Sequence, residues 1–134
     1  MVVGRQPCAG GIVFDGAGRL LLIRRGKPPA KGSWSVPGGR CRAGEDPADA
    51  CVREVAEETG LDVVVQRYAG RVERDAPGGG IYVIDDYVCA VAGGMLQAAD
   101  DADDAGWFDR ADLAGLALVP GLVEALTAWD ALPR

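Results

Sequence analysis

Apolar and polar positions follow two periods along the chain, one typical of strands and one typical of helices. Apolar runs at 8–15 and 19–25 flank the turn sequence Asp-Gly-Ala-Gly and predict a hairpin. Runs at 62–74 and 80–92 predict two further strands around a glycine-rich turn. Short extended stretches are expected at 34–36, 95–98 and 106–108, and loops at 26–33 and 100–104.

The clearest helical pattern covers residues 47–59. Its apolar residues recur every three to four positions, which places them on one face of a helix. Asp46 is the expected N-cap, and Gly60 follows where helices favour a left-handed residue. A second helix is expected at 119–132, and a short turn or helix at 110–113. Strands and helices mix without a linker or repeat, so residues 1–134 are expected to form one layered α/β or α+β domain.

The composition is that of a globular domain with an acidic balance. Apolar residues make up 49% of the 134, and no apolar run approaches the roughly 18 residues of a membrane helix. Residues 1–7 contain no apolar signal segment, so a cytoplasmic location is expected. The net charge of −6 argues against a nucleic-acid polymer or a membrane as partner. It allows a small phosphorylated substrate, because metal ions bridge acidic protein and anionic ligand.

Histidine and cysteine usage limits the chemistry further. The chain has no histidine, and none of its four cysteines forms a C-x-x-C pair. The usual zinc sites and catalysis of the Ser-His-Asp type are therefore excluded. The cysteines are expected to be reduced and mostly buried.

Glutamates gather on one arc of the predicted helix. Glu54, Glu57 and Glu58 lie side by side next to its apolar face, and like charges at this spacing repel. Arg53 can neutralise only one of them, whereas a hard divalent cation would offset the rest. A simple solvated helix face is the competing interpretation. The pair Gly38-Gly39, just before the helix, favours a ligand site because glycine lets the backbone approach a ligand closely.

The same residues match a known motif. The pattern G-x5-E-x7-R-E-U-x-E-E-x-G-U, in which U is a bulky aliphatic residue, resembles the Nudix box and spans residues 39–61. The residues at its fixed positions are Gly39, Glu45, Arg53, Glu54, Val55, Glu57, Glu58, Gly60 and Leu61. Segments 34–39, 21–26 and 107–108 are also similar to parts of Nudix proteins, so the chain resembles the Nudix hydrolase family over nearly its whole length.

This resemblance implies an α/β/α sandwich with a mixed sheet, and hydrolysis of a nucleoside diphosphate linked to another group with Mg²⁺ or Mn²⁺. By position, Glu57 and Glu58 would bind metal, Glu54 would bind metal or activate water, and the carbonyl of Gly38 or Gly39 would be a further ligand. Arg53 and Glu45 would form an ion pair that fixes the loop to the helix, and Gly60 would end the helix. The further acid that many members carry in a late loop would come from Asp100, Asp101, Asp103 or Asp104, and Asp101 is our choice.

The substrate is less sharply indicated. The run Arg24 to Pro29 resembles small ADP-ribose pyrophosphatases, which often carry a proline about where Pro77 lies. ADP-ribose or a similar nucleoside diphosphate sugar is therefore favoured, with Arg25, Trp34, Gly38 and Gly39 expected to bind it. Two alternatives stay open: a pyrophosphatase of nucleoside triphosphates, including oxidised ones, and a nucleotide sensor without catalysis. Many Nudix relatives are homodimers, so a homodimer is a further expectation.

Overall fold

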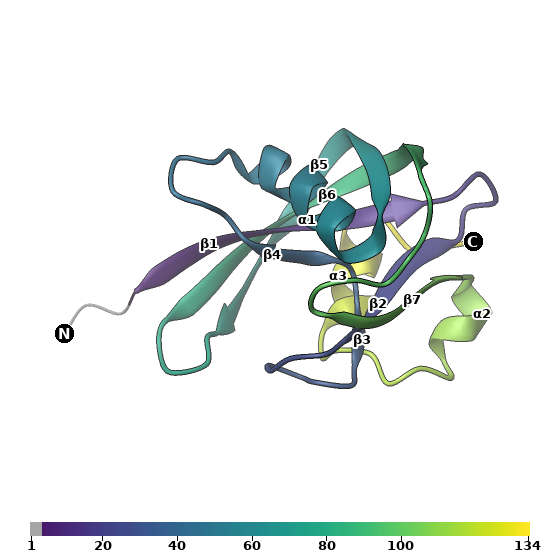
Figure 1. Ribbon diagram of the computed structural model, residues 1–134. Coiled ribbons are helices and arrows are strands. Elements are labelled where there is room, and N and C mark those ends of the chain that lie inside the picture. Colours follow the sequence, from purple (N-terminus) through teal and green to yellow (C-terminus); the bar gives the residue numbers. More distant parts are fainter. Residues whose placement is uncertain (1–3) are drawn as a thin grey trace.

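One mixed β-sheet forms the centre of the protein, as the computed structural model of residues 4–134 shows (Figure 1). Its strands are β1 (Arg5–Phe14), β2 (Leu20–Arg25), β3 (Trp34–Ser35), β4 (Gly38–Arg40), β5 (Leu61–Asp75), β6 (Ile81–Gly94) and β7 (Ala102–Phe108). The order is β3-β2-β1-β6-β5, with β4 paired to β1 and β7 paired to β2. β1 and β6 run parallel, and the other pairs are antiparallel. The expected α/β fold with a mixed sheet is confirmed.

Helices cover both faces of this sheet. Successive residues of a strand point to opposite faces, and β1 is buried on both. On one face Ala9 and Val13 belong to a core formed with α1 (Pro47–Thr59). On the other face Ile12 packs with Leu126 of α3 (Leu122–Ala128). α1 therefore lies above the sheet in Figure 1 and α3 behind it, while the short α2 (Arg110–Leu113) follows β7.

α1 begins and ends where the sequence predicts. The Asp46 side chain accepts a hydrogen bond of 2.8 Å from the Ala48 amide, and Pro47 occupies the first turn. Gly60 adopts φ 74°, and its amide donates to the Ala56 carbonyl. These local signals fix which residues face the sheet and which arc carries the glutamates.

Three elements differ from the sequence-based expectations. Residues 38–40 form β4, because they pair with the Cys8–Gly10 segment of β1 despite two glycines. Residues 95–98 do not form a strand: the amides of Gln97 and Ala99 bond instead to the carbonyls of Thr59 and Glu58 at the end of α1. The expected loop at 100–104 ends earlier, because β7 begins at Ala102 and pairs with β2.

The C-terminal helix is also shorter than residues 119–132. It starts at Leu122 because Pro120 and Gly121 precede it, and Gly121 has φ 84°. It stops at Ala128, and two residues later Asp130 has φ 53°. The expected lack of a signal segment concerns residues 1–7, of which 1–3 lie outside the described part. Within residues 4–134, no helix is long and apolar enough to cross a membrane.

Candidate metal and nucleotide site

A cavity of about 1010 Å³ opens beside α1. Its lining runs from α1 through residues 35–40 to α3. We call the part lined by Glu54, Glu58 and Gly39 the carboxylate end. The part lined by Asp86 and Trp129 we call the sheet end. The two ends thus belong to one continuous space that touches both layers of helices.

Glu58 is the most buried acid at the carboxylate end. Its residue is only 4% exposed, and its Oε1 accepts a hydrogen bond of 2.7 Å from the Gly38 amide. Burial raises the pKa of Glu58 to about 8, and the charge of Glu54 adds to this effect. The Gly38 amide opposes the shift, because a hydrogen bond to the carboxylate favours the charged form. A buried carboxyl group with so few donors is suited to binding a cation.

Glu54 lies next to Glu58 and faces β4. Burial raises its pKa, while its hydrogen bond with Arg53 lowers it. A Cβ atom at Gly39 would lie 2.6 Å from the carboxyl carbon of Glu54. Only glycine at position 39 therefore leaves the Glu54 carboxylate where it is. This contact gives a structural reason for the first glycine of the motif.

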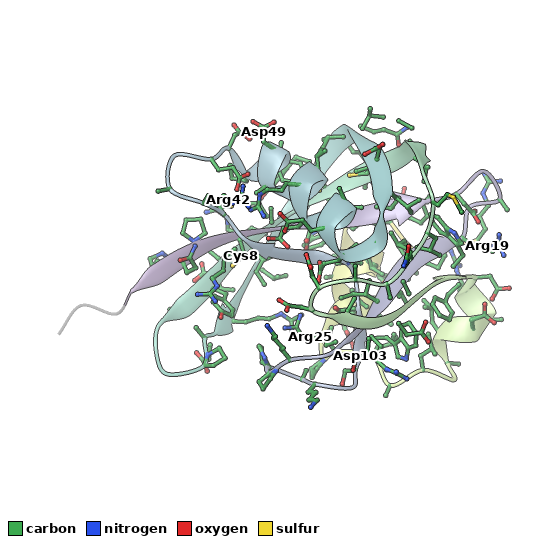
Figure 2. All side chains as sticks on the ribbon, viewed as in Figure 1. Cys8, Arg19, Arg25, Arg42, Asp49 and Asp103 are labelled. Carbon is green, nitrogen blue, oxygen red and sulfur yellow. The ribbon has the colours of Figure 1, made fainter. Side chains whose placement is uncertain are left out.

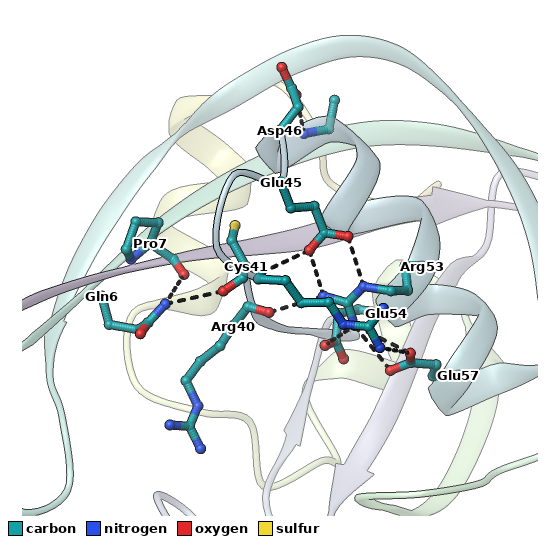
Figure 3. A network of polar contacts seen from close by, with 11 residues as sticks. Gln6, Pro7, Arg40, Cys41, Glu45, Asp46, Arg53, Glu54 and Glu57 are labelled. Atoms are coloured by element: carbon teal, nitrogen blue, oxygen red, sulfur yellow. Dashed lines mark hydrogen bonds and ion pairs between the residues drawn. The ribbon is translucent and has the colours of Figure 1, made fainter.

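Arg53 joins the loop before α1 to the helix, as Figure 3 shows. Its Nη2 and Nε donate to the two oxygens of Glu45 at 2.8 and 2.9 Å, and Nη2 also donates to the Arg40 carbonyl. Its Nη1 donates to Glu54 at 2.8 Å and to Glu57 at 3.2 Å. The hydrogen bonds that Glu45 accepts from Arg53, and one from the Arg42 amide, hold the pKa of Glu45 down at about 2. The ion pair expected between Glu45 and Arg53 is present.

Glu57 does not line the cavity. Arg53 and Arg42 both contact its carboxylate, at 3.2 and 3.4 Å, and so hold it on the outer side of α1. Among residues 4–134, no three acidic or cysteine side chains form a group that could hold a metal ion. The three glutamates of the arc therefore do not form one cluster in this arrangement. The assignment of Glu57 as a metal ligand stays a prediction.

The remaining predicted residues separate into two groups. Arg25 and Asp101 line the same cavity as Glu58. Figure 2 shows Arg25 below α1, and its Nε donates to the Pro29 carbonyl at 2.6 Å. Asp101 is paired with Lys27 at 2.8 Å, and its charge raises the pKa of both Glu54 and Glu58.

Trp34 is not part of the cavity lining. Its ring packs edge-on against Phe108, with the ring centres 5.2 Å apart, and belongs to the core on the α3 side. The contact between Trp34 and the nucleotide stays a prediction, and this arrangement does not favour it. The reason is local: Trp34 lies in β3, which pairs with β2 and places the indole among core residues.

Comparison with known proteins agrees with this geometry. The family model for the NUDIX domain matches residues 4–129. The chain belongs to the Nudix family. An ADP-ribose pyrophosphatase from Methanocaldococcus jannaschii is 38% identical over 108 residues, which cover 78% of this chain and 63% of that protein. A putative 8-oxo-dGTP diphosphatase 2 from Mycobacterium tuberculosis is 34% identical over 95 residues, covering 71% of this chain and 67% of that protein.

The fold comparison gives the same family. The structure of a MutT NUDIX hydrolase from Burkholderia pseudomallei superposes with a TM-score of 0.82 at 26% identity, covering 92% of this chain and 97% of that one. The Nudix chain thus shares the whole architecture with a solved hydrolase structure. The match of this chain to the protein from Methanocaldococcus jannaschii covers less than two thirds of that protein's own length.

The carboxylate end of this Nudix domain suits a hard divalent cation. Glu54 and Glu58 offer oxygen donors, both are shielded from solvent enough to raise their pKa, and both border the cavity. Mg²⁺ commonly binds one or two carboxylates and completes its shell with water and substrate phosphates. Two carboxylates that line a nucleotide-sized cavity match that requirement.

One cavity residue was not among the candidates from sequence. Asp86 of β6 is 6% exposed and lies at the sheet end. Its Oδ1 is the one fully buried side-chain oxygen or nitrogen of residues 4–134 that lacks a hydrogen-bond partner. The signal in the sequence was the pair Asp85-Asp86 inside an otherwise apolar strand.

Proposed function

We propose that this Nudix domain hydrolyses the diphosphate linkage of a nucleoside diphosphate joined to another group, with Mg²⁺ or Mn²⁺. The observation that carries the proposal is the position of Glu54 and Glu58. Both are box carboxylates at one end of a cavity large enough for a nucleotide, with Glu58 buried and Glu54 half-buried. The membership of the chain in the Nudix family supports the same reaction class.

Glu54 and Glu58 would hold the metal ion, with Gly39 beside them. When bound, such an ion polarises phosphoryl oxygens and lowers the pKa of bound water. Glu58 is kept in place by the Gly38 amide, and Glu54 by Arg53. Glu57 would join the ligands only after its carboxylate leaves Arg53, which holds it through Nη1.

A carboxylate must also take the proton of the attacking water. Glu54 would fill this role in place of binding the metal, because its raised pKa makes it a stronger base than an exposed glutamate. Asp101 is the second candidate, since it lines the cavity and is exposed enough to move with its loop. Arg25 lines the same end and would bind diphosphate oxygens through its guanidinium group. Arg53 would act by positioning Glu54.

We favour ADP-ribose, or a similar nucleoside diphosphate sugar, as the substrate. The relative from Methanocaldococcus jannaschii carries the name ADP-ribose pyrophosphatase. Pro77 also lies about where the sequence resemblance places a proline in such proteins. A pyrophosphatase of oxidised nucleotides is the second candidate, favoured by the name of the mycobacterial relative. A sensor without catalysis is less favoured, because every fixed position of the box is filled. The homodimer and the cytoplasmic location stay predictions.

A panel of substrates separates these candidates. The protein would be incubated with ADP-ribose, other nucleoside diphosphate sugars, and normal and oxidised nucleoside triphosphates, each with Mg²⁺ and with Mn²⁺. We expect AMP and ribose 5-phosphate from ADP-ribose, because cleavage of the diphosphate gives these two products. Pyrophosphate from a triphosphate at a higher kcat/KM would favour the second candidate. Binding of nucleotides without any product under either metal would contradict the proposal.

A further inference from the structure

Asp86 lies in the cavity wall without the partners that a buried carboxyl group normally has. Its Oδ1 is fully buried and accepts no hydrogen bond from residues 4–134. Buried polar groups are rarely left without a partner, and such a group is often completed by a ligand. The neighbouring arginine offers no pairing, because Arg71 is bound to Asp85 through Nε and Nη2. Because Asp86 also lines the cavity, its carboxyl group is the polar group that a molecule entering there would meet.

A glycine in the neighbouring strand β1 makes room for this carboxyl group. Gly10 of β1 pairs with Asp86 in the parallel register, and a Cβ atom at Gly10 would collide with Asp86 Oδ1. Arg74 also lines the cavity, but it forms no ion pair with Asp86 within residues 4–134. Burial raises the pKa of Asp86 to about 7, and the charge of Asp85 adds to the rise while Arg74 opposes it.

The walls around Asp86 are apolar and suit a flat ring. Ile84 shares a face of β6 with Asp86, and Ile12, Leu126 and Trp129, which belong to one hydrophobic cluster, also line the cavity. A sugar with several hydroxyl groups would need several polar partners there, whereas a nucleobase needs apolar walls and a few directed polar contacts. The cavity continues from this place to Glu54 and Glu58. A nucleotide with its phosphates at the carboxylate end can therefore extend its base toward Asp86.

From this placement we infer that Asp86 is a specificity-determining residue that accepts a hydrogen bond from an exocyclic amino group of the nucleobase. The inference rests on the proposed function, because it takes the cavity as the nucleotide site. Above its pKa of about 7, the Asp86 carboxylate only accepts hydrogen bonds, so it favours an amino group over a keto group. The adenine amino group of ADP-ribose meets this requirement.

Binding of three nucleoside monophosphates tests the inference. AMP, GMP and IMP have no diphosphate to cleave. IMP lacks the amino group of each of the other two but keeps a ring N–H, so a preference over IMP reports on the exocyclic amino group alone. Calorimetric titrations of the full chain with Mg²⁺, at a pH above the pKa of Asp86, would give the dissociation constants. We expect AMP or GMP to bind about tenfold or more tightly than IMP, since a hydrogen bond to a charged group is worth at least this factor.

Two variants and one control keep the result decisive. Asp86→Asn keeps a carbonyl acceptor but loses the charge, so it should reduce the preference over IMP in part. Asp86→Leu neither donates nor accepts and should reduce this preference to about twofold or less. Asn has the size of Asp, so the first variant keeps the fold if the second does not. Asp85→Asn is the control, because Asp85 contacts Tyr68 and Arg71 outside the cavity lining, and the preference should persist.

Three results would overturn the inference: equal binding of all three nucleotides, no binding of any, or a preference that survives in both Asp86 variants. A loss of affinity that is equal for all three would also overturn it, because Asp86 would then contact sugar or act structurally. The failure of the proposed function looks different. In that case the panel gives no hydrolysis, while the base preference and its dependence on Asp86 remain.

Discussion

Replacing Asp86 by Asn should make the protein more stable at alkaline pH. The Asp86 carboxyl group is buried, and its charge must be held without a hydrogen-bond donor to Oδ1. Its pKa is about 7 in the folded chain, against 3.8 for an ordinary aspartate. The folded state therefore binds a proton more tightly than the unfolded state. Stability from this group is fully present below about pH 4 and is lost as the pH rises through 7.

The size of the effect follows from the two pKa values. A difference of about three pKa units corresponds to about 4 kcal/mol of unfolding free energy, reached above roughly pH 7. Asn has the same shape and does not ionise, so Asp86→Asn escapes this loss. The variant and the parent should be about equally stable near pH 4 and differ by up to about 4 kcal/mol near pH 8.

Urea unfolding of both chains without metal, followed by fluorescence between about pH 4 and pH 9, measures this difference. Asp85→Asn serves as the opposite control. Arg71 lowers the pKa of Asp85, so that stability is present at neutral pH and is lost as the pH falls. Asp85→Asn should accordingly destabilise the protein at neutral pH and less in acid. A gap in unfolding free energy between parent and Asp86→Asn that stays constant over the whole pH range would show that the Asp86 carboxyl group does not titrate in this way.

Three further predictions concern the box. Arg53→Ala should lower the unfolding free energy by about 2 kcal/mol in thermal denaturation, because it removes several partly buried charge-assisted bonds. Arg42→Ala, at an exposed contact of 3.4 Å, should change the unfolding free energy by less than about 0.5 kcal/mol. Equal losses in the two variants would contradict the larger role of Arg53. Gly39→Ala should reduce kcat/KM at least about tenfold, because the added Cβ displaces Glu54. Gly16→Ala, with open space around its Cβ, should leave kcat/KM unchanged. Equal activity of the two variants would show that the contact between residue 39 and Glu54 does not matter for turnover. Glu58→Gln should lower kcat about a hundredfold or more. It should not lower stability, because it removes a buried ionisable group and keeps the shape of the side chain. Undiminished turnover of this variant would show that Glu58 is not a metal ligand.

Local signals made α1 predictable to the residue. Asp46, Pro47 and Gly60 act within the helix and its ends, so no distant contact is needed to place them. β4 was not predictable in this way. A strand of Gly38, Gly39 and Arg40 exists because β1 offers a pairing edge, and that edge depends on the whole sheet.

The candidate site shows the same division. The arc of glutamates followed from helical periodicity, and Glu54 and Glu58 do face the cavity. Periodicity could not show that Arg53 and Arg42 hold Glu57 on the outer side, because this depends on side-chain positions. Asp86 was visible as an acid in an apolar strand. Its burial depends on the parallel pairing of β6 with β1, which the sequence does not encode locally.

In the proposed reaction, water attacks a diphosphate phosphorus with the help of Glu54 and Glu58. The most direct measurement is hydrolysis of ADP-ribose in water labelled with heavy oxygen, with mass spectrometry of the two phosphate products. We expect one labelled oxygen per cleavage, in either AMP or ribose 5-phosphate, only when Mg²⁺ or Mn²⁺ is present. We also expect almost no product from Glu54→Gln or Glu58→Gln, while Glu124→Gln, at an exposed position of α3, cleaves like the parent. Cleavage without metal, or full activity of both cavity variants, would rule out the proposed reaction.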